Sequence, residues 1–261
     1  MGIVQDGQTH GAGSLLNRYI KSCVGHEKVM IKEILLRPND GADPVDFPSR
    51  DQSISPRLAL RMATQDAHAR LEENACMHRL MAPGVTVNDY ALVLQAFAAW
   101  HEPLEYLLSD LPMVDPDADR RQSKAQWLTA DLTDLVTNFG IRLPEISAPF
   151  GLGLERPADT PALLGMAYVV EGATLGGEII ARHLKKYLNP DIPMRFFTAY
   201  GPERSIMWQR FQKLLDAHIF NQASLQHAIS AANATFESLD HWLSQQPDLT
   251  ISRLPRALVS P

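Results

Sequence analysis

Cysteine is scarce in this chain of 261 residues, which contains only Cys23 and Cys76 and no pair in CxxC spacing. Two cysteines cannot build the disulfide framework of a small secreted domain, and the CxxC signature of a zinc or dithiol site is missing. Basic residues are also in the minority, with 24 Lys and Arg against 30 Asp and Glu and a formal net charge of -6. This balance gives no general attraction to nucleic acid, so we expect no nucleic-acid partner.

Long apolar runs are missing as well, and we expect no secretory leader. The longest apolar runs fall short of the roughly 20 residues that cross a bilayer as a helix. The opening residues, MGIVQDGQTHGAGSLL, have no charged start followed by an apolar core. We therefore expect a cytoplasmic protein without a membrane partner. The hydrophobic share of 45% and the charged share of 21% are those of an ordinary globular protein.

The sequence shows no strict alternation of apolar and polar residues, which would mark a half-buried strand. Apolar residues recur instead at helical spacing, which predicts one all-α, multi-helical domain with about five long helices. The expected helices cover residues 55–82, 90–111, 123–139, 161–188 and 202–243. The expected organisation is a poorly ordered extension at 1–54, the helical domain at 55–245 and a tail at 246–261.

Start and stop signals mark several of these helices. Ser55 is the expected N-cap of the first helix, and either Thr86 or Asn88 is expected to cap the second. Thr160 is the expected cap of the fourth helix. Pro103 lies inside the second helix and is expected to kink it.

A possible ligand-binding set lies on the first helix of the domain. His68 and Glu72 are four residues apart and so share a helical face. A histidine that binds a metal usually donates its other ring N–H to a carboxylate, which fixes the ring orientation. Arg61, two turns earlier, is suited to pairing with an anionic group beside the ligand. A solvated His–Glu pair without any ligand explains the same spacing.

A second candidate is the glycine-rich segment YVVEGATLGGE at 168–178. Each glycine inside a helix costs about 1 kcal/mol relative to alanine. Gly172 and Gly176 lie one turn apart, which leaves a groove free of side chains on one helical face. Either a flat ligand or another closely packed helix fits such a groove.

Together these segments resemble the bacterial haem oxygenases, particularly the biliverdin-producing branch associated with bacteriophytochromes. The resemblance covers roughly residues 55–245 and is carried by LRMATQDAHARLEE at 60–73, YVVEGATLGGEIIARHL at 168–184 and FFTAYGPERSIMWQRF at 196–211. It implies a haem oxygenase-like fold that holds haem between a proximal and a distal helix. It also implies a reaction in which O2 and electrons from an external donor open haem to biliverdin, carbon monoxide and ferrous iron.

The resemblance assigns a role to each candidate residue. His68 falls on the proximal iron ligand and Glu72 on its hydrogen-bonding partner. Arg61 falls on a basic position that contacts a haem propionate. Gly172 and Gly176 fall on the distal-helix glycines that lie over the haem face and take part in catalysis. The resemblance further implies a reductase or ferredoxin as electron donor and a bilin-binding photoreceptor as a recipient of the product.

Two features of the family pattern are not matched at a defined residue. Mammalian-type members carry an aspartate directly after the first distal glycine, and this chain has Ala173 there. Proton delivery is therefore unassigned. Basic residues that contact propionates are expected near the last helix, where Arg204, Arg210 and Lys213 are the candidates.

Two alternative functions stay open. A haem carrier or sensor, or a scaffold without haem, would need no turnover. A non-haem iron oxidase would need several carboxylates and histidines that project inward from different helices. The residues available for such a site are His101, Glu102, Glu105, Glu171, His183 and His218. No Glu-x-x-His pair occurs on the expected core helices, which weighs against this alternative.

Overall fold

The computed structural model describes residues 55–144, 146 and 151–246 of the chain. Its regular elements are eight α-helices and three short 3-10 helices, and no strand occurs within these residues. The predicted all-α fold class is therefore confirmed. The predicted extension at 1–54 and the part of the predicted tail at 247–261 lie outside the described residues.

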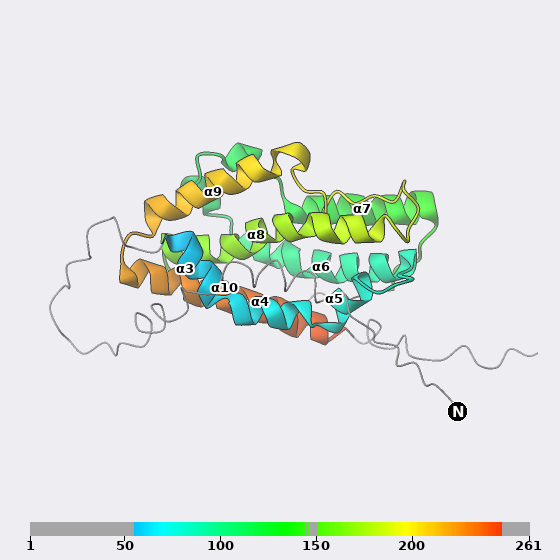
Figure 1. Cartoon of the computed structure of the whole chain (residues 1–261), viewed down its shortest axis with the longest axis horizontal. Helices are drawn as coiled ribbons and strands as arrows, with labels where there is room; N and C mark the ends of the chain where they lie inside the picture. Colours follow the sequence, from blue (N-terminus) through cyan, green and yellow to red (C-terminus); the bar gives the residue numbers. More distant parts are fainter. Residues whose placement is uncertain (1–54, 145, 147–150, 247–261) are drawn as a thin grey trace, which may run out of the picture. The chain divides into compact units, whose positions relative to one another are not determined.

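Five helices of the described region have 15 residues or more, as many long helices as predicted (Figure 1). They are α6 (Val87–Leu107), α7 (Lys124–Phe139), α8 (Thr160–Leu184), α9 (Arg204–His218) and α10 (Gln222–Ser244). The most extensive contact between two helices joins α8 to α10, and α6 packs mainly against α7.

A glycine sets the close approach of α8 to α10. A Cβ atom built on Gly165 would lie 2.1 Å from the carbonyl oxygen of Ala228, far inside van der Waals contact. Leu164 and Ala232 are fully buried on the same two helices. The two helices therefore pack backbone against backbone at this point, and no larger residue fits at 165.

The single helix predicted over residues 55–82 is wrong. The chain forms three short helices there: α3 (Pro56–Ala63), α4 (Gln65–Glu72) and α5 (Ala75–Leu80). The first break falls at Thr64, whose hydroxyl donates to the Leu60 carbonyl at 2.8 Å and whose ψ of 1° departs from helical geometry. The second falls at Asn74, whose side chain caps α5 by accepting the Cys76 N–H at 3.0 Å.

The single helix predicted over residues 202–243 is also wrong, because the chain reverses between α9 and α10 (Figure 1). Asn221 starts α10 with a reciprocal cap. Its side chain accepts the Ser224 N–H at 2.8 Å, and the Ser224 hydroxyl accepts the Asn221 N–H at 3.1 Å. Neither Pro nor Gly marks this turn, and the apolar periodicity continues across it, so the sequence predicts a single helix.

Other boundaries agree more closely with the sequence. Ser55 occupies the N-cap position of α3, as predicted. Thr86 caps α6 in a capping box with Asp89, which decides between the two predicted caps. The N-cap of α8 is Asp159 rather than the predicted Thr160. Pro103 lies inside α6, as predicted, and the helix continues for four residues beyond it.

Helix α8 is the central apolar element of the described region. By length and composition alone it is the one described helix that could cross a membrane, contrary to the expectation that no apolar run is long enough. Its apolar window is 61% buried within the protein, much of it against α10. Such burial is typical of the core helix of a globular domain.

Candidate functional site

The predicted pair of His68 and Glu72 forms on α4. The Nδ1 atom of His68 lies 3.4 Å from a carboxylate oxygen of Glu72, and the histidine side chain is 51% exposed. The imidazole also meets the ring of Phe236 on α10 edge-on, with 5.6 Å between the ring centroids. Its Nε2 atom has no hydrogen-bond partner among the described residues. The ring is therefore oriented from one side and available to a ligand from the other.

The surroundings of Glu72 are partly apolar. Burial raises the pKa of Glu72, while the neighbouring His68 lowers it and Glu73 raises it further. A half-buried carboxylate that faces an imidazole gains from accepting its N–H. The arrangement is the one in which a carboxylate fixes the tautomer of a ligating histidine.

Arg61 lies on α3, exposed and without a carboxylate partner among the described residues. Burial raises the pKa of Tyr168 on α8, and the adjacent Thr64 hydroxyl and the Arg61 guanidinium lower it in part. The junction of α3 and α4 therefore lies against α8 at Tyr168. The break at Thr64 separates Arg61 from His68, so their spacing alone does not put them on one face.

The two predicted glycines differ from their neighbours on α8. A Cβ atom on Gly177 would lie 2.7 Å from the Phe197 carbonyl oxygen, which makes Gly177 a packing residue. A Cβ on Gly172 would meet only the Trp208 ring, at 3.8 Å, and one on Gly176 would meet nothing within 4 Å. Close packing against the non-helical segment that carries Phe197 therefore explains Gly177 but not Gly172 or Gly176.

The open glycines share their helical face with exposed apolar side chains. Leu175 is 40% exposed and Ile179 is 42% exposed, and both lie within one turn of Gly176. Elsewhere α8 is largely buried. This part of α8 thus presents an apolar surface that has space in front of its backbone.

The His68 and glycine segments are connected through one contact. Thr64 lies beside Tyr168, His68 is one turn beyond Thr64, and Gly172 is one turn beyond Tyr168 on α8. The two helices run in the same direction from this contact (Figure 1), and both α4 and α8 pack on α10. His68 and Gly172 therefore lie on two helices that share α10 as a neighbour.

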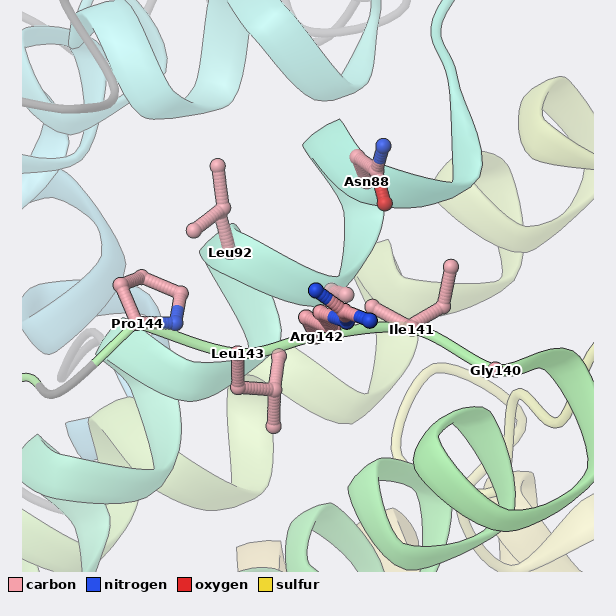
Figure 2. A pocket seen from close by; sticks show the side chains of 8 residues that line it. Asn88, Leu92, Gly140, Ile141, Arg142, Leu143 and Pro144 are labelled. Carbon is pink, nitrogen blue, oxygen red and sulfur yellow. The ribbon is translucent and has the colours of Figure 1, made fainter.

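Two surface hollows occur in the described region, and one of them is lined by Leu175, the neighbour of Gly176. Figure 2 shows one of about 500 Å³, where the segment 140–144 lies beside Asn88 and Leu92 of α6. Another, of about 570 Å³, lies between the C-terminal half of α8 and the segment 198–205. Neither hollow is lined by His68, Gly172 or Gly176. The candidate site is therefore defined by His68, Gly172 and Gly176 rather than by either hollow.

A buried charge cluster directly precedes Gly172, and the sequence did not predict it. One oxygen of Glu171 accepts from Lys124 at 2.7 Å, and the other accepts from Arg121 at 2.9 Å. The Tyr200 hydroxyl donates to the same carboxylate at 3.1 Å, and Asp115 pairs with Arg121. The sequence indicates Glu171 only as a candidate iron ligand. Its ionic partners are distant in the sequence, so no local pattern indicates the charge cluster.

The residues considered for a non-haem iron site do not come together. Within the described residues, no group of three His, Cys, Asp or Glu side chains is placed to hold a metal ion. His101 packs edge-on between the rings of Trp100 and Phe196, and burial lowers its pKa to about 3. His183 lies 3.4 Å from the Ala82 carbonyl oxygen. The inward-facing cluster that a non-haem iron oxidase needs is therefore not formed by the described residues.

The basic candidates near the last helices have different surroundings. Arg204 forms an ion pair with Glu178 at 2.6 Å, and Arg210 forms one with Asp117 at 2.5 Å. Lys213 is exposed and has no ionic partner among the described residues. Of the three, only Lys213 has a charge that is not already balanced by a neighbour.

Comparison with known proteins agrees with this arrangement of helices. The family model for haem oxygenase matches residues 57–245. A curated haem oxygenase from Xanthomonas campestris pv. campestris (strain 8004) is 33% identical over 92 residues, which are 35% of this chain and 56% of that protein. The chain thus matches little more than half the length of this relative.

Two solved structures share the fold. The haem oxygenase from Leptospira interrogans superposes with a TM-score of 0.60 at 18% identity, over 73% of this chain and 99% of that one. The NO- and CO-bound haem oxygenase from Neisseria meningitidis superposes with a TM-score of 0.58 at 21% identity, over 73% of this chain and 91% of that one. The predicted haem oxygenase-like helical fold is confirmed. With the family model spanning most of its length, the chain belongs to the haem oxygenase family.

Proposed function

We propose that this protein binds haem and cleaves it to biliverdin, carbon monoxide and ferrous iron, with O2 and electrons from an external donor. One observation carries the proposal within the family: His68, whose Nε2 is free, and the open Gly172 lie on two helices, α4 and α8, that both pack on α10. An exposed imidazole and a backbone face without side chains are what a planar iron macrocycle requires on its two sides.

The residues present fit haem in three respects. His68 has a free ring nitrogen that would hold the haem iron, and a neutral imidazole is a common haem ligand. Gly176 has open space before it, and Leu175 and Ile179 supply exposed apolar contact beside it. Arg61 is a free cation for an anionic propionate.

Glu72 has the role of orienting His68. A carboxylate that accepts the Nδ1–H of the ring keeps Nε2 deprotonated and makes it a better donor to iron. The partly buried position of Glu72 holds the carboxylate against the ring rather than leaving it in bulk water. Bound haem supplies the iron and the ring that are oxidised, and the protein supplies orientation and surroundings.

On the opposite side, Gly172 and Gly176 leave main-chain groups close to the reacting face. Ala173 has no side chain that carries a proton. The Thr174 hydroxyl is already committed, since it donates to the Glu171 carbonyl at 2.7 Å. Protons therefore reach the site from solvent, main-chain amides act only as hydrogen-bond donors, and the role of the two glycines is to keep that side accessible.

Finer features of the proposal follow the sequence resemblance. They are membership of the bacteriophytochrome-associated branch, a cytoplasmic location, a reductase or ferredoxin as electron donor, and a bilin-binding photoreceptor as product recipient. The exposure of His68 on α4 supports access by a partner to the proximal side.

A haem carrier or sensor is the second candidate function. The observation that favours it is Ala173, which leaves the distal helix without the acidic side chain of mammalian-type members. Such a protein would have the same His68 ligation and would not consume haem.

The test is a titration of the purified protein with haemin, followed by ascorbate in air. A sharp Soret band that saturates at one equivalent, then decays as a broad red bilin band grows, is the expected result. A stable Soret band under reductant would favour the carrier. No saturable band would refute haem binding itself.

A further inference from the structure

The cluster around Glu171 consists of charges that are almost wholly removed from water. Its members are Asp115, Arg121, Lys124 and Glu171, whose side chains are each 6% exposed or less, together with the Tyr200 hydroxyl. Two acids balance two bases. Buried ion pairs add little net stability, because desolvation offsets their attraction, and apolar replacements often serve as well. A cluster of this kind is therefore better explained by what it positions.

Two separate segments converge on Glu171, one at residues 118–124 and the other at Tyr200. Arg121 follows the 3-10 helix Ala118–Arg120, Lys124 begins α7, and Tyr200 precedes the 3-10 helix Gly201–Glu203. Both carboxylate oxygens are used, and the hydroxyl of Thr174 also holds the Glu171 carbonyl. This residue of α8 is consequently fixed through its side chain and its main chain.

The next residue along the helix has almost nothing to fix it. A side chain at Gly172 would touch only the Trp208 ring, and one at Gly176 would touch nothing within 4 Å. The open side of this turn anchors it little, since Gly172 and Gly176 have no side chains and those of Leu175 and Ile179 are exposed. The anchor is on the other side, at Glu171.

Tyr200 is held in an unusual conformation at the same cluster. Its φ of 60° makes it the one non-glycine residue with positive φ in the described part of the chain. Its hydroxyl accepts from Lys124 at 2.6 Å, and the Lys124 Nζ atom lies 4.6 Å from its ring centroid. A bulky residue stays in the left-handed region only where its surroundings hold it there, and such positions gather at functional sites.

We propose that Glu171 is a positioning residue: its carboxylate, held by Arg121, Lys124 and Tyr200, fixes the Gly172–Gly176 turn of α8 and so sets the space on its open face. The consequence for turnover rests on the proposed haem oxygenase function. The fixing of the turn is independent of haem and is tested without it.

The principal variant is Glu171→Gln, which keeps the shape and removes the charge. Amide hydrogen exchange in the haem-free protein is followed by mass spectrometry for peptides that cover 168–178. Loss of the anchor should speed exchange in this segment by about tenfold or more, because local opening sets the exchange rate. Peptides from α5 and α6 should keep their wild-type rates.

The matched control is Asp89→Asn. Asp89 is another largely buried carboxylate, which pairs with Arg79 at 2.5 Å and closes the capping box of α6 away from this turn. The control should leave exchange at 168–178 unchanged. Equal acceleration by both variants, or none by Glu171→Gln, would overturn the proposal.

Haem binding and turnover provide the second readout. Since His68 on α4 is untouched, Glu171→Gln should change the haemin Kd by less than about threefold while it slows biliverdin formation by about tenfold. If the wild-type protein binds no haem, the proposed function fails and the exchange result still decides the positioning role. Wild-type turnover in a variant with faster local exchange would overturn the link to catalysis.

Tyr200→Phe serves if Glu171→Gln does not fold. It keeps the ring over Lys124 and both ion pairs and removes only the hydroxyl. The expected acceleration of exchange at 168–178 is smaller, about threefold, and still local. Unchanged exchange in this variant would contradict a role for the whole cluster.

Discussion

His68 and Glu72 are joined at 3.4 Å across one turn of α4, and this contact occupies Nδ1 while Nε2 faces no partner in the described region. A second pair of the same type lies on the neighbouring segment, where His78 contacts Glu73 at 3.2 Å and both side chains are largely exposed. What separates the two pairs is their surroundings. His68 packs on Phe236, and α4 begins at the contact with Tyr168 of α8.

This difference predicts opposite results for two substitutions. His68→Ala should weaken haemin binding by at least about 100-fold, since even loss of a residue that only supports a metal ligand costs 10- to 100-fold. His78→Ala should leave the haemin Kd unchanged. The measurement is a Soret titration of both variants, and an unaltered band in His68→Ala would remove His68 as the axial ligand.

The glycines of α8 predict a contrast in stability. Gly176→Ala should raise the free energy of unfolding of the haem-free protein by about 0.5–1 kcal/mol, because alanine is the better helix former and the new methyl group has space. The same variant should slow biliverdin formation by narrowing the open face.

Gly165→Ala should instead destabilise the fold severely, since its methyl group would lie 2.1 Å from the Ala228 carbonyl oxygen. Urea unfolding of both variants compares the two positions directly. Destabilisation by Gly176→Ala equal to that of Gly165→Ala would show that Gly176 is a packing residue after all.

The free charge of Arg61 leads us to expect that haemin affinity depends on the carboxylates of haem. Arg61→Ala should weaken haemin binding by about 5- to 10-fold, as expected for loss of one partly solvated charge-assisted contact. Binding of haem dimethyl ester should be the same in both proteins. Arg156→Ala, which removes an arginine paired with Asp110 elsewhere, is the control. Equal weakening for the ester would show that Arg61 does not act on the propionates.

His101 predicts a pH dependence of stability. Burial lowers the pKa of His101 from 6.5 to about 3, so the folded protein keeps it neutral while the unfolded chain protonates near pH 6.5. The unfolded state then binds more protons between about pH 6.5 and 3, and stability falls as the pH decreases through this window. From pH 7.5 to 5.5 this group alone should cost about 1.4 kcal/mol.

The check is urea unfolding of the wild-type protein and of His101→Leu at both pH values. The variant should lose less stability on acidification, by about 1.4 kcal/mol. An identical loss in the two proteins would mean that His101 is protonated in the folded state.

Local patterns in the sequence were sufficient for the helical class and for selecting several candidate residues. His68 with Glu72, and Gly172 with Gly176, are spaced by one helical turn, so their relation is visible without a structure. Thr86 was recognisable as a cap for the same reason. The sequence could not show which glycines pack and which are open, since that depends on Ala228 and Phe197 from other segments.

Interactions between distant segments account for what was missed. Glu171 meets Arg121 and Lys124 across about 50 residues of sequence, and no local spacing indicates that contact. The breaks at Thr64 and Asn221 arise from side-chain hydrogen bonds to the nearby main chain. Such bonds compete with an apolar periodicity that continues on both sides of the break.

The central claim is that this protein consumes haem, and the most direct measurement is the carbon monoxide released when its haemin complex is reduced in air with catalase present. The account predicts about one carbon monoxide and one biliverdin for each haem lost, and neither product from His68→Ala. Haem that stays bound and intact, with no carbon monoxide above a protein-free control, would contradict it.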